Sequence, residues 1–169
     1  MLKIIEGVKD ANEKDCPLPA LALALTLPDI CSQIEYPHEK NVGNRYEDWY
    51  DNFIYKHEND GVMFANFMSN QHDKKDSFHR FNGYVCYTLR CLLLHRGDAG
   101  IDSDLEVDDV YFRVHTDATP GENKKIYKDG KMVEYVSINS KQLCHYLCDY
   151  ALKYYENSHK KEMFNRRIL

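Results

Sequence analysis

Residues 78–98 read FHRFNGYVCYTLRCLLLHRGD, and this stretch decides the fold that we expect from the chain. Apolar side chains recur in it at helical spacing, so they form one continuous stripe along a predicted helix. Gly97 follows the last apolar turn and suits the left-handed cap of a helix end. The stripe consists of Phe78, Phe81, Val85, Leu89 and Leu92. We expect the rest of the chain to act as the scaffold that holds this helix.

The composition is that of a soluble globular protein. With 169 residues the chain is long enough for a sizeable core, and we expect residues 1–169 to form a single domain. No run of about 18 apolar residues is present, so we predict no transmembrane helix and no membrane contact. Six cysteines without a signal peptide indicate reduced thiols and a cytoplasmic location. The net charge of −5 argues against broad nucleic-acid binding but leaves room for a local basic site.

Four further helices are expected around the central one. Their apolar spacing and their Pro and Asn start signals indicate helix formation. Pro28 either kinks or restarts the second of them. Residues 58–77 read as a loop that holds one short helix. The expected helices cover residues 1–15, 17–36, 45–57 and 139–158.

Residues 110–136 differ from the helical remainder because they alternate in strand fashion. They are expected to form a small antiparallel sheet, with a hairpin turn at Asp129-Gly130. Residues 159–169 are basic and are expected to form a frayed tail. The sequence therefore predicts a mainly α protein, a helical bundle with a small antiparallel β-sheet or hairpin insertion.

Arg90 and His95 stand out against the apolar background of the central helix. Residues five apart on a regular α-helix point about 140° away from each other. The two side chains can therefore meet only if Arg90 reaches along the helix and His95 lies at its fraying end. A second copy of the chain across a two-fold axis would gather two such pairs in one cleft.

The Arg90-x4-His95 pattern at the end of a late helix resembles the signature of the HEPN superfamily (higher eukaryote and prokaryote nucleotide-binding domains), in which Arg is followed by His after four to six residues. The resemblance implies a dimeric helical bundle that is either a metal-independent endoribonuclease of toxin–antitoxin and defence systems or a non-catalytic binding module. Cys91 stands where the family often has a polar residue. The sequence that flanks the motif also resembles that of a group of uncharacterised bacterial proteins. This second resemblance implies no activity.

The resemblance implies that Arg90 and His95 are the catalytic residues. It implies a homodimer, an RNA substrate and an antitoxin or regulatory protein as partner, with no cofactor and no metal. Histidine titrates near neutral pH and can move a proton, while a guanidinium matches the charge of a phosphorane. Basic residues near the two ends of the central stretch are the candidates for contacting RNA phosphates, namely Lys74, Lys75, His79, Arg80 and Arg96.

A purely structural interpretation stays open beside the catalytic one. In it, Arg90 pairs with a carboxylate such as Asp48 or Asp51. His95 then caps the helix C-terminus, where a cation is favoured. The chain would in that case be a binding module or a structural protein without a site.

Two other groups of residues are typical of a core rather than of a site. Cys144, His145 and Cys148 lie on one predicted helix, but zinc needs more ligands nearby than these. An aromatic stripe at helical spacing could stack on bases, yet such a stripe more often packs inside the protein. This stripe consists of Tyr46, Trp49, Tyr50 and Phe53.

Overall fold

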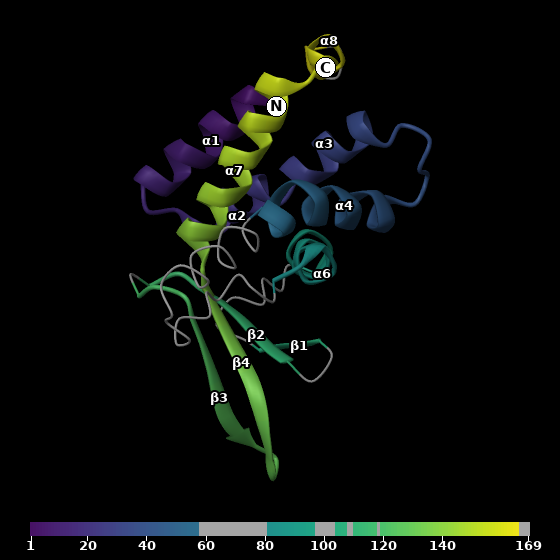
Figure 1. The fold of residues 1–169 in the computed structure, drawn as a ribbon. Helices are drawn as coiled ribbons and strands as arrows, with labels where there is room; N and C mark the ends of the chain where they lie inside the picture. Colours follow the sequence, from purple (N-terminus) through teal and green to yellow (C-terminus); the bar gives the residue numbers. More distant parts are fainter. Residues whose placement is uncertain (58–80, 97–103, 108–109, 118, 166–169) are drawn as a thin grey trace, which may run out of the picture.

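The computed structural model describes residues 1–57, 81–96, 104–107, 110–117 and 119–165 (Figure 1). Helices predominate in it, and a small four-stranded sheet follows the central helix, so the prediction of a mainly α fold is confirmed. The helices are α1 (Leu2–Glu13), α2 (Pro17–Ala24), α3 (Leu27–Glu35), α4 (Val42–Tyr50), the π-helix η1 (Asp51–Tyr55), α6 (Gly83–Cys91), the π-helix η3 (Leu92–Arg96), α7 (Ser140–Asn157) and α8 (Lys161–Asn165). The strands are β1 (Leu105–Val107), β2 (Val110–His115), β3 (Glu122–Lys128) and β4 (Lys131–Asn139).

Asparagine caps set the starts of three helices. Asn139 accepts a hydrogen bond from the backbone N–H three residues on, as expected for the start of α7. Asn41 does the same for α4, which therefore begins at Val42, earlier than predicted. Asn82 does so for α6, the central helix. This helix therefore begins at Gly83, later than the predicted start at Phe78. A cap at Asn82 satisfies a free N–H of the first turn and fixes that boundary.

The sheet is mixed, which corrects the prediction of an antiparallel sheet. Its strand order is β1-β2-β4-β3, and β2 runs parallel to β4 from Val110↔Glu134 to His115↔Asn139. The alternation of side chains in the sequence identifies strands, but it does not say which strand lies beside which. The predicted hairpin is confirmed, because β3 and β4 pair around a turn in which Asp129 and Gly130 have φ of 49° and 82°. Two positive φ values are typical of a type I′ turn.

Helices and strands share one hydrophobic core. The cluster of buried residues includes Val136 and Ile138 of β4 together with residues of the helices. Phe81 bridges the two parts, since its ring lies 6.3 Å from that of Phe112 on β2. Figure 1 shows the β3–β4 hairpin extending away from the helices. The expectation that the aromatic stripe of α4 is core is confirmed by its three buried members, Tyr46, Trp49 and Tyr50.

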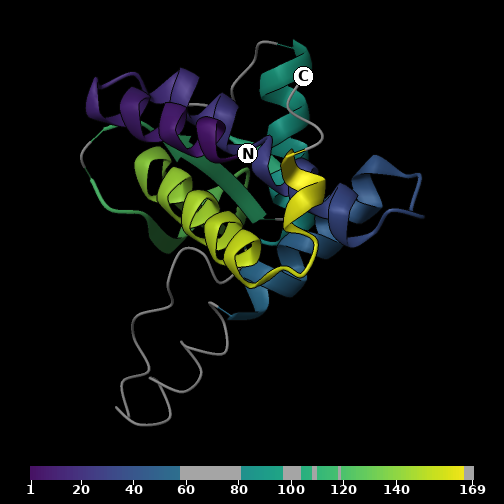
Figure 2. The ribbon, with the colours of Figure 1, turned by 90° about the horizontal axis from the view of Figure 1, so that it is seen from above.

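The described part of the expected basic tail is a helix. Figure 2 shows α8 turned away from the axis of α7 at the end of that helix. Phe164 is 3% exposed, and its ring packs edge-on against those of Tyr154 and Tyr155. Burial of this one aromatic ring holds the segment in place. The basic residues around Phe164 in the sequence predict a frayed tail instead.

The stretch Pro17–Glu35, which contains α2 and α3, could cross a membrane by length and composition alone. Its mean hydropathy is 1.3, and half of the window is buried inside the protein. Core helices of soluble proteins pass the same test. The sequence predicts no segment long and apolar enough to cross a membrane, and this stretch differs from that prediction.

Gly83 allows α6 to lie directly against the backbone of α4. A Cβ at Gly83 would lie 2.5 Å from the carbonyl oxygen and 2.7 Å from the Cα of Glu47. We therefore expect Gly83→Ala to destabilise the protein by about 1–3 kcal/mol, because backbone atoms must move to make room. Urea denaturation of the purified variant measures this change.

Gly7→Ala is the matched control. Gly7 lies in the interior of α1, where a Cβ would meet only Leu23 Cδ1 at 3.4 Å. Alanine there should raise stability by about 0.5–1 kcal/mol, because it removes the entropic penalty of glycine in a helix. Equal effects of the two substitutions would contradict the role assigned to Gly83.

Candidate functional site

Arg90 and His95 are in contact. Nη1 of Arg90 lies 2.9 Å from Nε2 of His95. The reason is that α6 continues into the π-helix η3, and a π-helix bonds each residue to the fifth one along. Arg90 lies in α6 and His95 in η3, so the wider turns of η3 reduce the angle expected between the two side chains on a regular α-helix. The side chain of Arg90 then reaches His95.

The contact defines the state of the imidazole. A guanidinium can only donate hydrogen bonds, so Nε2 of His95 must accept. The imidazole is then neutral and carries its proton on Nδ1. His95 is exposed at the helix end, whereas only 16% of the Arg90 side chain is exposed. The pair thus joins a fixed cation beneath the surface to a neutral base at the surface.

Asp29 of α3 holds two arginines from two other helices. Its Oδ1 lies 2.9 Å from Nη2 of Arg45 on α4, and its Oδ2 lies 3.5 Å from Nη2 of Arg90. One carboxylate between two guanidiniums leaves one positive charge uncompensated within this group. The Nε atoms of both arginines are also buried without a hydrogen-bond partner among the described residues. Asp29, Arg45 and Arg90 together therefore carry one excess positive charge, in a chain of net charge −5.

Arg90 pairs with a carboxylate, as the structural interpretation expects. The partner is Asp29, and not Asp48 or Asp51, which were named as examples. Asp51 accepts the backbone N–H of Gly83 at 2.6 Å, at the opposite end of α6. No sequence pattern relates Asp29 to Arg90, since they lie 61 residues apart and meet only through helix packing.

The ring of Tyr87 lies close to the guanidinium of Arg90. The Arg90 guanidinium lies 6.0 Å from the centroid of the Tyr87 ring, which in turn packs against Tyr46 at 5.3 Å. Burial, followed by a hydrogen bond with Cys91, raises the pKa of the Tyr87 hydroxyl. Cys91 therefore contacts Tyr87, one turn away on the same helix.

The remaining predicted RNA contacts cannot be placed. Lys74, Lys75, His79 and Arg80 lie outside the described residues. Arg96 is the last residue of η3, and its side chain also lies outside them.

The cysteines of α7 are poorly suited to bind a metal. Burial raises the pKa of Cys144 to about 12 and that of Cys148 to about 11, so both thiols stay protonated near neutral pH. Among the residues that the structure describes, no three His, Cys, Asp or Glu side chains gather closely enough to hold an ion.

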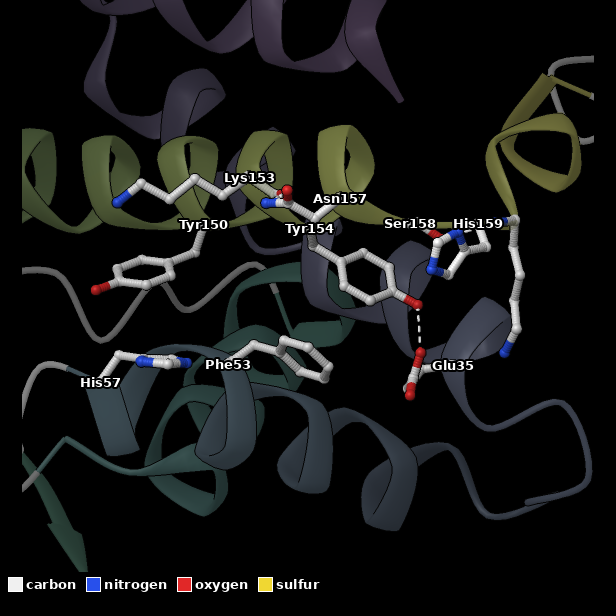
Figure 3. Close-up of a pocket in the computed structure, with 10 residues that line it drawn as sticks. Glu35, Phe53, His57, Tyr150, Lys153, Tyr154, Asn157, Ser158 and His159 are labelled. Atoms are coloured by element: carbon white, nitrogen blue, oxygen red, sulfur yellow. Dashed lines mark hydrogen bonds between the residues drawn. The ribbon is translucent and has the colours of Figure 1, made fainter.

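A cavity of about 780 Å³ lies elsewhere, between α3, η1, α7 and the turn before α8 (Figure 3). The rings of Phe53, Tyr150 and Tyr154 form much of its wall. The Tyr154 hydroxyl donates to Glu35 at 2.7 Å, and burial together with this carboxylate raises the pKa of Tyr154. Neither Arg90 nor His95 lines this cavity. Sequence reasoning missed it, although Tyr150 and Tyr154 share one face of α7.

Comparison of the chain with protein-family models, curated proteins and solved structures gave no match. The function must therefore be argued from the chemistry of the site itself.

Asp29→Asn tests the charge balance of the site. The substitution leaves two mostly buried guanidiniums without a counter-charge, so we expect a loss of about 2–4 kcal/mol in the free energy of unfolding. Asp10→Asn removes the carboxylate of the exposed Asp10–Lys14 pair and should change stability far less, because water screens the interaction. Denaturant titration of both variants measures the difference, and similar values would contradict a supporting role for Asp29.

Proposed function

We propose that this chain is a HEPN-like, metal-independent endoribonuclease in which Arg90 and His95 form the catalytic pair. The observation that carries the proposal is the 2.9 Å contact between the guanidinium and the imidazole, produced by the π-helical end of α6. π-helical turns occur frequently at functional sites. The uncompensated positive charge around Asp29 supports a phosphate as the ligand, because it favours anions in an otherwise acidic chain.

The pair supplies the two functions that RNA cleavage without a metal requires. A substrate phosphate would take the place of the imidazole on Arg90, which frees Nε2 of neutral His95. Nε2 then takes the proton of the 2′-hydroxyl, and the 2′-oxygen attacks the phosphorus. Arg90 stabilises the negative charge of the phosphorane with parallel hydrogen bonds. The 5′-oxygen leaves with a proton, which gives a 2′,3′-cyclic phosphate and a 5′-hydroxyl.

The leaving oxygen needs an acid in addition to the base. In our proposal His95 of a second subunit, in its protonated imidazolium form and released from its own Arg90, supplies that proton and becomes neutral. The enzyme is therefore a homodimer with two central helices near the axis. A cytoplasmic ribonuclease of this type would be restrained by an antitoxin or regulatory protein.

A second candidate function is a non-catalytic module that binds RNA or protein. The observation that favours it is the pairing of Arg90 with Asp29, which leaves only 16% of the Arg90 side chain exposed. In this alternative the positive charge holds a phosphate or a carboxylate, and His95 transfers no proton.

The mechanism predicts RNA cleavage in the presence of EDTA. Products should end in a 2′,3′-cyclic phosphate, and DNA of the same sequence should remain intact because it lacks the 2′-hydroxyl. His95→Ala should lower the rate by about 10² to 10⁴, since it removes the proton-transfer group. Arg90→Lys should not restore the rate, because a point charge cannot replace the bidentate guanidinium. Labelled oligonucleotides resolved on denaturing gels measure each rate.

Cys91→Ala is the control in this assay. The Cys91 thiol contacts Tyr87 and takes no part in the proposed proton transfer, so we expect the rate to stay nearly unchanged. Cleavage that persists in both His95→Ala and Arg90→Ala would show that another site is responsible. A dimeric wild type that binds RNA without cutting it, and loses binding in Arg90→Ala, would identify the module instead.

The dimer is tested separately by light scattering coupled to size-exclusion chromatography. We expect twice the mass of one 19.9 kDa chain at micromolar concentration. A monomeric mass across that range would remove the second His95 from the mechanism.

A further inference from the structure

The sheet has one face that the catalytic proposal does not use. On β2, Phe112 and Val114 point into the core, so the alternate residues point to the opposite face. The register of β2, β3 and β4 brings polar and aromatic residues together on that side, which we call the outer face. It carries Tyr111, Arg113, His115, Lys124, Tyr135 and Ser137.

A cavity of about 480 Å³ opens on the outer face. Its lining includes Arg113, His115, Lys124 and Ser137, from three different strands. A volume of this size is within the usual range for small-ligand sites. The Ser137 hydroxyl accepts the backbone N–H of Glu122 at 3.2 Å, which fixes one wall.

His115 is the most unusual group in this cavity. It is 6% exposed, and its Nδ1 lies 2.7 Å from Oδ1 of Asp117. Hydrogen bonds from the Thr119 hydroxyl and N–H, and then from His115, lower the pKa of Asp117, so the carboxylate is ionised at neutral pH. A carboxylate can only accept, so Nδ1 carries a proton. In the neutral tautomer with that proton, Nε2 is an acceptor.

Nε2 of His115 is buried and has no hydrogen-bond partner among the described residues. Buried polar atoms in folded proteins are nearly always paired, and each exception requires an explanation. His115 is one of the residues that line the cavity, so a ligand bound there that donates a hydrogen bond would give Nε2 the missing partner. The group on the ligand is therefore a hydroxyl or an N–H.

Two cationic side chains line the same cavity. Arg113 Cζ lies 5.8 Å and Lys124 Nζ lies 5.4 Å from the centroid of the Tyr135 ring, so the ring holds both at the cavity. Glu122 pairs with Lys124 and Asp104 pairs with Arg113, which keeps the region close to neutral. Because the charges nearly balance, the cavity should not bind anions in general. It favours a ligand that has a hydrogen-bond donor next to an anionic group.

We propose that this cavity binds a ribose–phosphate unit of single-stranded RNA, with a ribose 2′-hydroxyl donating to His115 and the phosphate lying between Arg113 and Lys124. His115 and Arg113 are two residues apart on one face of β2, about 7 Å along the strand. The 2′-hydroxyl is the group by which proteins distinguish RNA from DNA. This inference rests on the proposed function, because it gives the RNA substrate a second point of contact.

The test measures binding separately from cleavage. Fluorescence anisotropy is recorded for a labelled RNA and the DNA of the same sequence, with His95→Ala present in every protein to prevent cleavage. Adding His115→Ala should raise the Kd for RNA about tenfold and leave the Kd for DNA unchanged, so the preference for RNA narrows. An unchanged preference would overturn the role of His115.

Lys124 and Lys125 give a matched pair, because they are neighbours on β3, both exposed, and point to opposite faces. Lys124→Ala should weaken RNA binding about three- to tenfold, and Lys125→Ala should leave it unchanged. Equal effects would mean that only the overall charge matters, which contradicts a site on the outer face. This arm stands even if His115→Ala does not fold.

Adenosine monophosphate distinguishes a free nucleotide from an RNA strand, since both contain the same ribose–phosphate chemistry. Weak competition that depends on His115 supports the strand as the natural occupant. Binding as tight as that of RNA would overturn the strand and identify a nucleotide site. Cleavage that requires His95, together with unchanged RNA affinity in the His115 and Lys124 variants, would overturn this inference and leave the proposed function intact.

Discussion

The close approach of α6 to α4 at Gly83 is the constraint on which the rest of the site depends. The α6 backbone lies so near to Glu47 that no side chain fits at this position. Asp51 fixes the same end of α6 by accepting the N–H of Gly83 at 2.6 Å. Because a helix is rigid, fixing its first turn also fixes where its last turn points. Arg90 therefore reaches Asp29 on α3 only because α6 begins where it does.

The π-helical end of α6 and the charge arrangement at Asp29 act together. The π-helix η3 brings His95 to Arg90. The guanidinium of Arg90 also pairs with Asp29 and lies near the ring of Tyr87. The contacts of Arg90 restrict its side chain, which in the proposed function would lower the entropic cost of binding a phosphate. His95 is exposed at the helix end.

An acidic protein can bind RNA only where positive charge is concentrated. This chain concentrates it at the Asp29 group, where one carboxylate serves two arginines. On the outer face the charges nearly balance, and Nε2 of His115 has no hydrogen-bond partner among the described residues. In our proposals the first place would bind a phosphate through its charge, and the second would bind a hydroxyl through a hydrogen bond. Both lie on parts joined by one hydrophobic core.

The sequence by itself determined most helices, the cap at Asn139 and the hairpin at Asp129-Gly130, because these depend on local spacing and turn chemistry. Arg90 and His95 remain a prediction from the sequence. Only the tertiary structure decided that β2 and β4 run parallel, that Asp29 is the partner of Arg90, and that His115 is one of the residues that line a cavity. Each of these depends on groups brought together from distant parts of the chain. Periodicity in a sequence reports which side of an element is buried, but not which element covers it.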